Sequence, residues 1–328
     1  MAAITRNSEI LYLYDARLCN PNGDPDEENR PRMDYDTGRN LVSDVRLKRY
    51  LRDYWLAKGQ DIWVRQVEEG REERTVSAKQ RIDLLAKEFG AKSAKEASGK
   101  SEFRQWLLNR LKDVRLFGAT IPIGEEGARG ASITLTGPVQ FSWGYSLHPV
   151  EILPSSTITS TFAGREIGEK GEYGTMGKDW RVEYSFIAFY GLVSAWRAKK
   201  TNLTEEDVRD LDNALLAALP LQATTRSKIG QTPRLLLRVE YTDGETFLGD
   251  LRDYVNLEVT NTEGISELAD FKVDTARLVR LIEDNKDRVH LAYIWIHPDL
   301  RWKDKAFPEV LKEVLVEGKV QELPHREV

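Results

Sequence analysis

The stretch Ile10-Leu11-Tyr12-Leu13-Tyr14 decides the fold. Successive side chains of a β-strand point to opposite faces, so Ile10, Tyr12 and Tyr14 share one face while Leu11 and Leu13 share the other. Both faces are at least partly apolar, and this is typical of a strand in the middle of a sheet. We therefore predict a sheet with residues 10–14 at its centre.

The segments that follow alternate between helices and strands. Ser43 is a suitable N-cap for a helix that runs to about Gly59, with Leu47, Tyr50, Leu51 and Tyr54 as its buried stripe. A second helix is capped by Thr204, has acids in its first turn, and is expected to stop at Pro220. The remaining predicted elements are strands at 133–136, 139–143, 182–191, 234–241 and 289–295, and a helix at 275–285.

The order strand–helix–strands–helix–strand predicts an α+β fold. It is typical of a ferredoxin-like antiparallel sheet of the RNA-recognition-motif kind, with helices on one face. We expect one domain over residues 1–328 with two insertions. The first is helical and covers residues 75–113; the second covers residues 145–181 and is rich in glycine. A long glycine-rich excursion from a compact domain is more often functional or mobile than packed.

Composition excludes several classes of protein. The 328 residues carry a formal net charge of −5, which argues against a protein that binds DNA unspecifically over its whole surface. A local basic groove is still compatible with this net charge. Cys19 is the single cysteine and allows no intramolecular disulfide. No apolar run is long enough for a membrane span and no signal-peptide core is present, so we expect a cytoplasmic protein without a membrane partner.

Motifs for catalysis and for cofactor binding are missing. The four histidines are scattered, and no zinc spacing, P-loop, dinucleotide fingerprint or nucleophile elbow occurs. Asp24-Pro25-Asp26 resembles the start of a calcium loop but fails the EF-hand pattern, because Asn29 stands where glycine is required. Acids in such a loop usually cap backbone N–H groups. We therefore expect no catalytic residue, no metal and no cofactor.

Two basic clusters are candidates for phosphate contacts. The first contains Arg46, Lys48, Arg49 and Arg52 on the first helix, where a solvated helix face is an equal alternative. The second contains Arg226, Lys228, Arg234 and Arg238, together with the hydroxyls of the loop Thr224-Thr225-Arg226-Ser227-Lys228, in a stretch, residues 222–238, that contains no acid. Arginine forks, lysine ammonium groups and hydroxyls all suit phosphate oxygens.

Aromatic side chains on two strands are candidates for base stacking. Tyr12, Tyr14, Phe186 and Phe189 occupy strands where RNA-recognition sheets place stacking rings. Aromatic residues on strands more often belong to the core, and we favour that interpretation here.

Several ordered motifs resemble one known family. They are Asn20-Pro21-Asn22-Gly23-Asp24-Pro25, Arg30-Pro31-Arg32, residues 41–49, residues 113–118, Gly174-Thr175-Met176-Gly177 and residues 221–228. Together they resemble the backbone subunit of the CRISPR Cascade complex, and most closely its type I-B (Csh-type) branch. The resemblance extends from about residue 8 to residue 240.

The resemblance implies a hand-shaped protein with a palm, helical fingers at 75–113 and a thumb hairpin at 145–181. Copies would stack in a helical filament along one CRISPR RNA (crRNA) and present its guide bases for pairing with target DNA, beside other Cascade subunits. Met176 at the thumb would act as an apolar wedge between bases. The implied RNA-binding residues are Asn20, Asn22, Arg32, Arg46, Lys48, Arg49, Met176, Lys178, Thr225, Arg226, Ser227 and Lys228.

The resemblance also implies that the chain is not an enzyme, since type I backbone subunits leave cutting to a separate nuclease-helicase. Two alternatives stay open. Relatives in type III complexes cleave RNA with an acid in the corresponding region, and Asp24 or Asp26 could fill that place. The other alternative is a stand-alone RNA-binding module, although an insertion of thumb length would then have no neighbour to reach.

Overall fold

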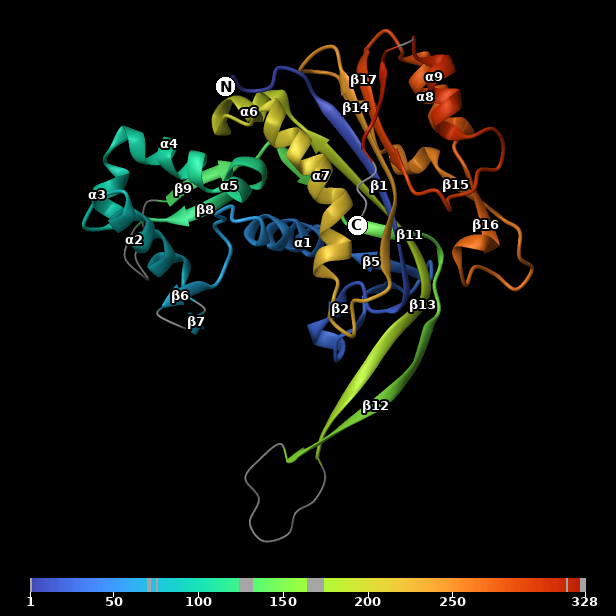
Figure 1. Ribbon diagram of the computed structural model, residues 1–328, viewed down its shortest axis with the longest axis horizontal. Coiled ribbons are helices and arrows are strands. Elements are labelled where there is room, and N and C mark those ends of the chain that lie inside the picture. The colour runs from blue at the N-terminus through green and yellow to red at the C-terminus, as the bar shows by residue number, and fades with distance from the viewer. Residues whose placement is uncertain are drawn as a thin grey trace.

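A large twisted β-sheet organises the molecule (Figure 1). The computed structural model describes residues 2–69, 72–74, 76–123, 132–163, 174–316 and 318–324. In order of hydrogen-bonded neighbours, the sheet contains β18 (Val320–Glu322), β17 (Val289–Ile296), β14 (Gln231–Tyr241), β1 (Ser8–Cys19), β13 (Gly174–Val193), β11 (Gly144–Pro149), β5 (Arg39–Val42) and β4 (Met33–Asp34). β10 (Val139–Phe141) and β12 (Ile152–Ala163) also pair with β13.

β1 lies at the centre of this sheet, as its sequence predicts. It pairs antiparallel with β13 on one side and with β14 on the other, while β18 joins β17 in parallel. The side chains of Tyr12 and Leu13, which are neighbours in sequence, belong to two different hydrophobic clusters because they point to opposite faces.

Helices cover one face of the sheet. α1 (Asp44–Ala57) begins at the Ser43 N-cap, and α7 (Glu205–Gln222) begins at a capping box between Thr204 and Asp207. Both helices pack on Ile10, Tyr12 and Tyr14 of β1. α6 (Ala195–Thr201) precedes α7. α7 continues through Pro220 to Gln222, so the expected stop at Pro220 is wrong by two residues.

The opposite face is covered as well. Phe271 of β16 (Phe271–Asp274), Leu278 of α8 (Ala276–Asp284) and Phe307 of α9 (Phe307–Val314) share a cluster with Leu11 and Leu13. The other elements of this layer are β15 (Asn256–Val259), η2 (Leu251–Tyr254) and η3 (Leu268–Asp270). The predicted α+β class is confirmed, but the expectation of helices on one face only is wrong. A second layer packs on this face and buries the apolar side chains of Leu11 and Leu13.

Residues 78–117 form a separate helical body. Its helices are α2 (Ala78–Glu88), α3 (Ala94–Ser98), α4 (Ser101–Arg110) and α5 (Lys112–Phe117). The hairpin of β8 (Gly118–Pro122) and β9 (Ser132–Thr136) completes its own hydrophobic cluster. Asp113 in α5 accepts bonds from Arg52 Nε of α1 (2.8 Å) and from the backbone N–H of Trp63 (2.6 Å), which fastens this body to the sheet. A short hairpin, β6 (Val67–Glu69) with β7 (Glu72–Arg74), lies nearby.

A long hairpin projects from the sheet (Figure 1). It consists of β12 and β13, which pair antiparallel, with Ile152 opposite Val182 and Thr159 opposite Met176. Gly164, Gly168 and Gly171 of the predicted thumb lie outside the described residues. β11, which opens the predicted 145–181 insertion, belongs to the main sheet and pairs with β5.

Loops rich in turn residues connect β1 to α1. They contain β2 (Gly23–Asp24), η1 (Pro25–Glu27), β3 (Arg30–Pro31) and β4. No helix in the described part of the chain is long and apolar enough to cross a membrane.

Our first prediction concerns the buried ion pair that fastens α7 to β14. Arg238 and Asp212 are each 1% exposed, and Nη2 of Arg238 lies 2.8 Å from Oδ2 of Asp212. Asp212→Ala leaves the arginine charge buried beside Glu240 alone, at 3.5 Å. We expect the free energy of unfolding to fall by about 3–5 kcal/mol in urea titrations.

The matched control is the exposed pair of Lys305 with Glu313. Lys305→Ala should change the free energy of unfolding by less than about 1 kcal/mol. Equal changes in the free energy of unfolding for the two substitutions would show that the buried pair does not stabilise the packing of α7 on β14.

Candidate nucleic-acid interface

Three segments far apart in sequence meet at the base of the long hairpin. The backbone N–H of Asn20, just after β1, donates to the carbonyl of Ser227 (2.8 Å) in the loop before β14. The Lys228 ammonium donates to the Asn20 carbonyl. Nη1 of Arg181, on β13, donates to the Leu18 carbonyl (3.1 Å). The strand order explains this meeting, because β13, β1 and β14 are adjacent.

The two asparagines of the loop after β1 support its shape. Asn22 Oδ1 accepts from both the N–H and the hydroxyl of Ser43 (2.9 Å each), so this side chain holds the N-cap of α1. Asn20 is buried, and its Nδ2 donates to the Asn29 carbonyl (2.6 Å). A Cβ at Gly23 would lie 2.8 Å from the same Asn29 oxygen, which explains the glycine. Both predicted asparagines are thus at the site, and each has a partner within the protein.

Cations from several elements gather around these loops. We call them the basic cluster: Arg30, Arg32, Arg46, Lys178, Arg181, Arg226 and Lys228. Four of them face carboxylates: Arg32 pairs with Asp24 (2.7 Å), Lys178 with Glu28 (2.6 Å), and both Arg181 and Arg226 with Asp179 (2.8 Å each). The side chains of Lys178 and Glu28 are 52% and 63% exposed, and an exposed pair of this kind contributes little to stability. Lys178 can therefore exchange its carboxylate for a phosphate at small cost.

Arg46 and Lys228 lie close enough for their charges to interact, and within the described residues both lack the ion pairs that Arg32, Lys178, Arg181 and Arg226 form. Among these residues Arg30 also lacks an ion pair, but its guanidinium lies over the Trp180 ring. The Arg46 guanidinium lies over the Tyr50 ring, 4.1 Å from its centre, and neither Arg46 nor Lys228 forms an ion pair with any carboxylate in the described part of the chain. Burial, with the nearby Arg46 charge, lowers the pKa of Lys228 to about 8. Two neighbouring cations without an anion are costly, since the charge of each disfavours that of the other. The arrangement favours an anionic ligand at this point.

Several buried polar atoms around these loops have no hydrogen-bond partner in the described part of the protein, and this also favours an anionic ligand. They include Nε of Arg30, Nε of Arg32, Nε of Arg46, Nε1 of Trp180 and Oδ1 of Asn20. Most buried polar atoms in proteins have a hydrogen-bond partner, so a group of exceptions needs an explanation. Four of these five atoms are donors, which suits the oxygens of a phosphate backbone.

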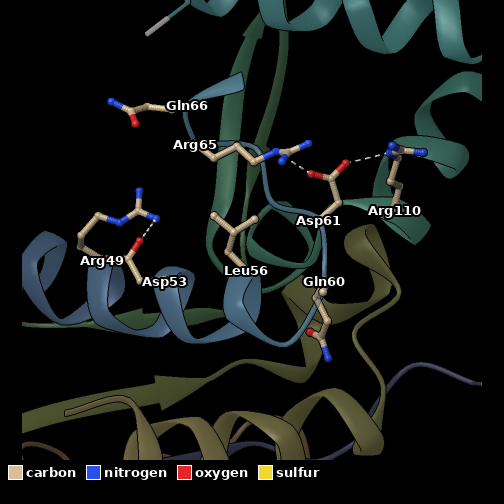
Figure 2. A pocket seen from close by; sticks show the side chains of 9 residues that line it. Arg49, Asp53, Leu56, Gln60, Asp61, Arg65, Gln66 and Arg110 are labelled. Carbon is tan, nitrogen blue, oxygen red and sulfur yellow. Dashed lines mark hydrogen bonds and ion pairs between the residues drawn. The ribbon is translucent and has the colours of Figure 1, made fainter. Parts of the chain in front are cut away.

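Two predicted residues of α1 lie away from the basic cluster. Lys48 is buried, and its ammonium bonds Asp44 (3.0 Å) and Gln140 (3.3 Å). Arg49 bonds Asp53 (2.6 Å) and the Val64 carbonyl (2.7 Å). It lines a cleft of about 760 Å³ beside the helical body, where Figure 2 shows Asp61 between Arg65 and Arg110. The structure therefore does not bring Lys48 and Arg49 to the site.

The remaining predicted residues lie at the site or beside it. The Thr225 carbonyl accepts from the N–H groups of Lys228 (2.8 Å) and Ile229 (2.9 Å) and closes the basic loop. Met176 lies on β13 in the hairpin, and its side chain is outside the described part of the structure.

Sequence reasoning missed three members of the site: Arg30, Trp180 and Arg181. Arg30 lies over the Trp180 ring at 5.1 Å. Lys178, Trp180 and Arg181 stand within four residues of one another, and this combination of cations with an aromatic ring was a usable signal in the sequence.

The aromatic residues considered for base stacking belong to the core. Tyr12 and Tyr14 are buried under the helices, and the Tyr12 hydroxyl donates to the Leu215 carbonyl (2.8 Å). Phe186 packs on Phe271, with ring centres 4.9 Å apart, and Phe189 is buried against Tyr14. The favoured core interpretation is correct for all four.

The acids of the loop are engaged by the protein itself. Asp24 caps η1 by accepting from the N–H of Asp26 (3.1 Å), and its other oxygen faces Arg32. Among the residues that the structure describes, no group of three or more His, Cys, Asp or Glu is placed to hold a metal ion.

Comparisons with known proteins agree on one family. Residues 6–276 match the family of CRISPR-associated protein Cas7. The chain is 36% identical over 299 residues to a CRISPR-associated protein Cas7 from Haloferax volcanii, covering 88% of this chain and 86% of that protein.

Among solved structures, the fold is similar to a chain of a CRISPR RNA-guided surveillance complex in a pre-nicking state, with a TM-score of 0.50, 16% identity and coverage of 94% and 98%. A chain of another CRISPR RNA-guided surveillance complex gives a TM-score of 0.44 at 13% identity, with coverage of 94% and 97%. The match over residues 6–276 and the 36% identity over most of both chains identify this protein as a member of the Cas7 family of CRISPR-associated proteins.

Proposed function

We propose that this chain is a backbone subunit of a type I-B CRISPR surveillance complex and that the basic cluster holds the phosphates of the guide RNA. The observation that carries the proposal is the pair Arg46 and Lys228, two cations close together without a carboxylate in the described residues. A phosphate between them would neutralise both. Contacts to phosphates leave the bases available for pairing, which suits RNA-guided recognition of DNA.

The strand order supports an RNA-recognition-motif palm. The neighbours β14, β1, β13 and β11 are antiparallel, and α1 and α7 pack together on one face. This arrangement matches the split β-α-β order of ferredoxin-like folds. In the proposal, the helical body of α2 to α5 forms the fingers and the β12–β13 hairpin forms the thumb. The thumb of each copy reaches its neighbour along the crRNA, beside other subunits of the complex, and target DNA binds through the guide.

A test of the phosphate contacts compares two arginines on the same helix. Arg46→Ala should weaken binding of single-stranded RNA about tenfold at low salt, because it removes a charged hydrogen-bond donor. The slope of log K against log salt should shrink by about 0.7. Arg49→Ala removes the same charge from the neighbouring cleft and should change neither quantity. Filter binding at several salt concentrations measures both, and equal effects of the two substitutions would refute the proposed phosphate position.

Lys228 gives the interface a pH dependence. Its pKa in the free protein is lowered to about 8, and a bound phosphate favours the charged ammonium. RNA affinity should therefore be full below pH 8 and fall as the pH rises through about 8. Oligoadenylate is a suitable probe between pH about 6.5 and about 9.5, since its bases do not titrate there.

The variants separate this titration from general weakening. Lys228→Met should bind more weakly and lose the step near pH 8, whereas Arg226→Ala should bind more weakly and keep it. A step of unchanged size in Lys228→Met would assign the titration to another group.

We also propose that the subunit does not cleave RNA. The carboxylate of Asp24 is engaged by Arg32 and by the N–H of Asp26, which disfavours a role in cleavage of the type III kind. Purified protein loaded with guide RNA should leave a complementary RNA intact in Mg²⁺ or Mn²⁺. Gel analysis of labelled target RNA measures this. Regularly spaced products that disappear in Asp24→Ala would favour the type III alternative.

A further inference from the structure

A second group of cations and aromatic rings surrounds the start of β11, near one end of the main sheet. Trp143 precedes β11 and is 47% exposed, and Tyr145 is half-buried. Gly144, between them, packs on the Phe189 ring at the helix-covered face, where a Cβ would lie 2.4 Å from the ring. Alternation along the strand therefore turns Tyr145 to the opposite face. Trp143 lies in the connection between β10 and β11.

The Arg252 guanidinium contacts both Trp143 and Tyr145, which we call the aromatic patch together with Arg39. Nη1 of Arg252 donates to the Trp143 carbonyl (2.6 Å), and the Arg252 guanidinium lies 4.3 Å from the Tyr145 ring centre. Asp250 balances the charge of Arg252. These contacts fix the backbone that carries both rings, so the Trp143 side chain is presented from a rigid base.

Arg39 supplies a cation beside the rings. It lies 5.1 Å from the Tyr145 ring centre and lines a hollow of about 410 Å³ next to that ring. Arg39 forms no ion pair with the acids of the described ranges, while Arg252 does. The patch therefore offers stacking surface together with a charge that suits a phosphate.

Arg32 connects this patch to the basic cluster. Its guanidinium lies 5.7 Å from the Trp143 ring centre, and the same side chain pairs with Asp24 at the base of the hairpin. A strand that binds the basic cluster thus passes within reach of the Trp143 indole. Alternating aromatic and cationic side chains are typical of surfaces that bind single-stranded nucleic acid.

We propose that Trp143 stacks on an unpaired base of the bound single-stranded RNA, with Arg39 placed for the adjoining phosphate. The inference rests on the proposed function and adds a base contact to it. The sequence placed candidate stacking rings on β1 and β13, where the C-terminal layer and the helices bury them. The same role falls to Trp143, because its side chain stays 47% exposed although η2 of the C-terminal layer contacts its backbone.

The test measures binding of a short single-stranded RNA to the purified full-length chain by fluorescence anisotropy. Trp143→Ala should weaken binding about tenfold, the order expected for the loss of one stacked base, with an unchanged salt slope. Trp143→Phe should retain most of the affinity and lose part of the RNA-induced quenching of tryptophan fluorescence. The matched control is Trp196→Ala, because Trp196 is 58% exposed and carries Lys200 over its ring at 4.3 Å, yet lies on α6. It should bind like the wild type.

The outcomes separate this inference from the proposed function. If Trp143→Ala binds like the wild type while Arg46→Ala still reduces the salt slope, the stacking site is wrong and the phosphate interface stands. If the wild type binds no RNA, both the stacking site at Trp143 and the proposed phosphate interface are wrong. Loss of assembly between copies without loss of RNA affinity would make Trp143 a protein contact and overturn the inference. Photocrosslinking with 4-thiouridine RNA should place adducts on the peptide around Trp143 and Tyr145, and adducts confined to other peptides would contradict it.

Discussion

Burial of β1 on both faces is the constraint on which the structure depends. Because Tyr12 faces the helices and Leu13 faces the C-terminal layer, two hydrophobic clusters form on a single strand. Each layer removes apolar surface from water, and neither could be lost without exposing one side of β1. The same strand fixes the register of β13 and β14 through antiparallel pairing along its length. The position of the interface follows from this register. Residues 20–22 follow β1, residues 226–228 precede β14, and residues 178–181 lie in the part of β13 that extends past the end of β1. They meet because these three strands are adjacent.

Charge at the interface is local and not a property of the whole chain. The protein is acidic overall, and four members of the basic cluster face carboxylates. These carboxylates limit unspecific attraction, and the exposed pair of Lys178 with Glu28 can open for a phosphate at small cost. Among the described residues, no carboxylate forms an ion pair with Arg46 or Lys228, and their charges disfavour each other. We therefore expect an anionic ligand to bind most favourably between these two side chains. A strand anchored there runs next to Arg32, whose position over Trp143 joins the two parts of the proposed RNA path.

Local patterns predicted the elements well. The alternation in residues 10–14, the Ser43 cap and the Thr204 cap each depend on neighbours in sequence, and each is present in the structure. The expected stop at Pro220 failed because proline removes only its own N–H. Ala223 can still donate to the Leu219 carbonyl and finish the turn. The basic loop at 225–228 was also predictable, since no acid within that stretch cancels its charge.

Contacts between distant segments could not be predicted in this way. Lys48 and Arg49 were grouped with Arg46 because all three lie on one helix. Their separation depends on Gln140 and Val64, which only the folded chain brings to them. The second face of the sheet is covered by the C-terminal layer, and Phe271 of that layer packs on Phe186. No pattern in the sequence around Phe186 indicates this contact. Trp143 gave no signal of its own, because its exposure and its contacts with Arg32 and Arg252 depend on segments distant in sequence.

The position of a phosphate between Arg46 and Lys228 can be checked in a structure of the RNA-loaded assembly determined by electron cryomicroscopy. We expect one backbone phosphate within hydrogen-bond distance of both the Arg46 guanidinium and the Lys228 ammonium in every copy that carries RNA. An RNA path that leaves Arg46 stacked on Tyr50, with no phosphate beside it, would show that these two cations do not hold the guide backbone.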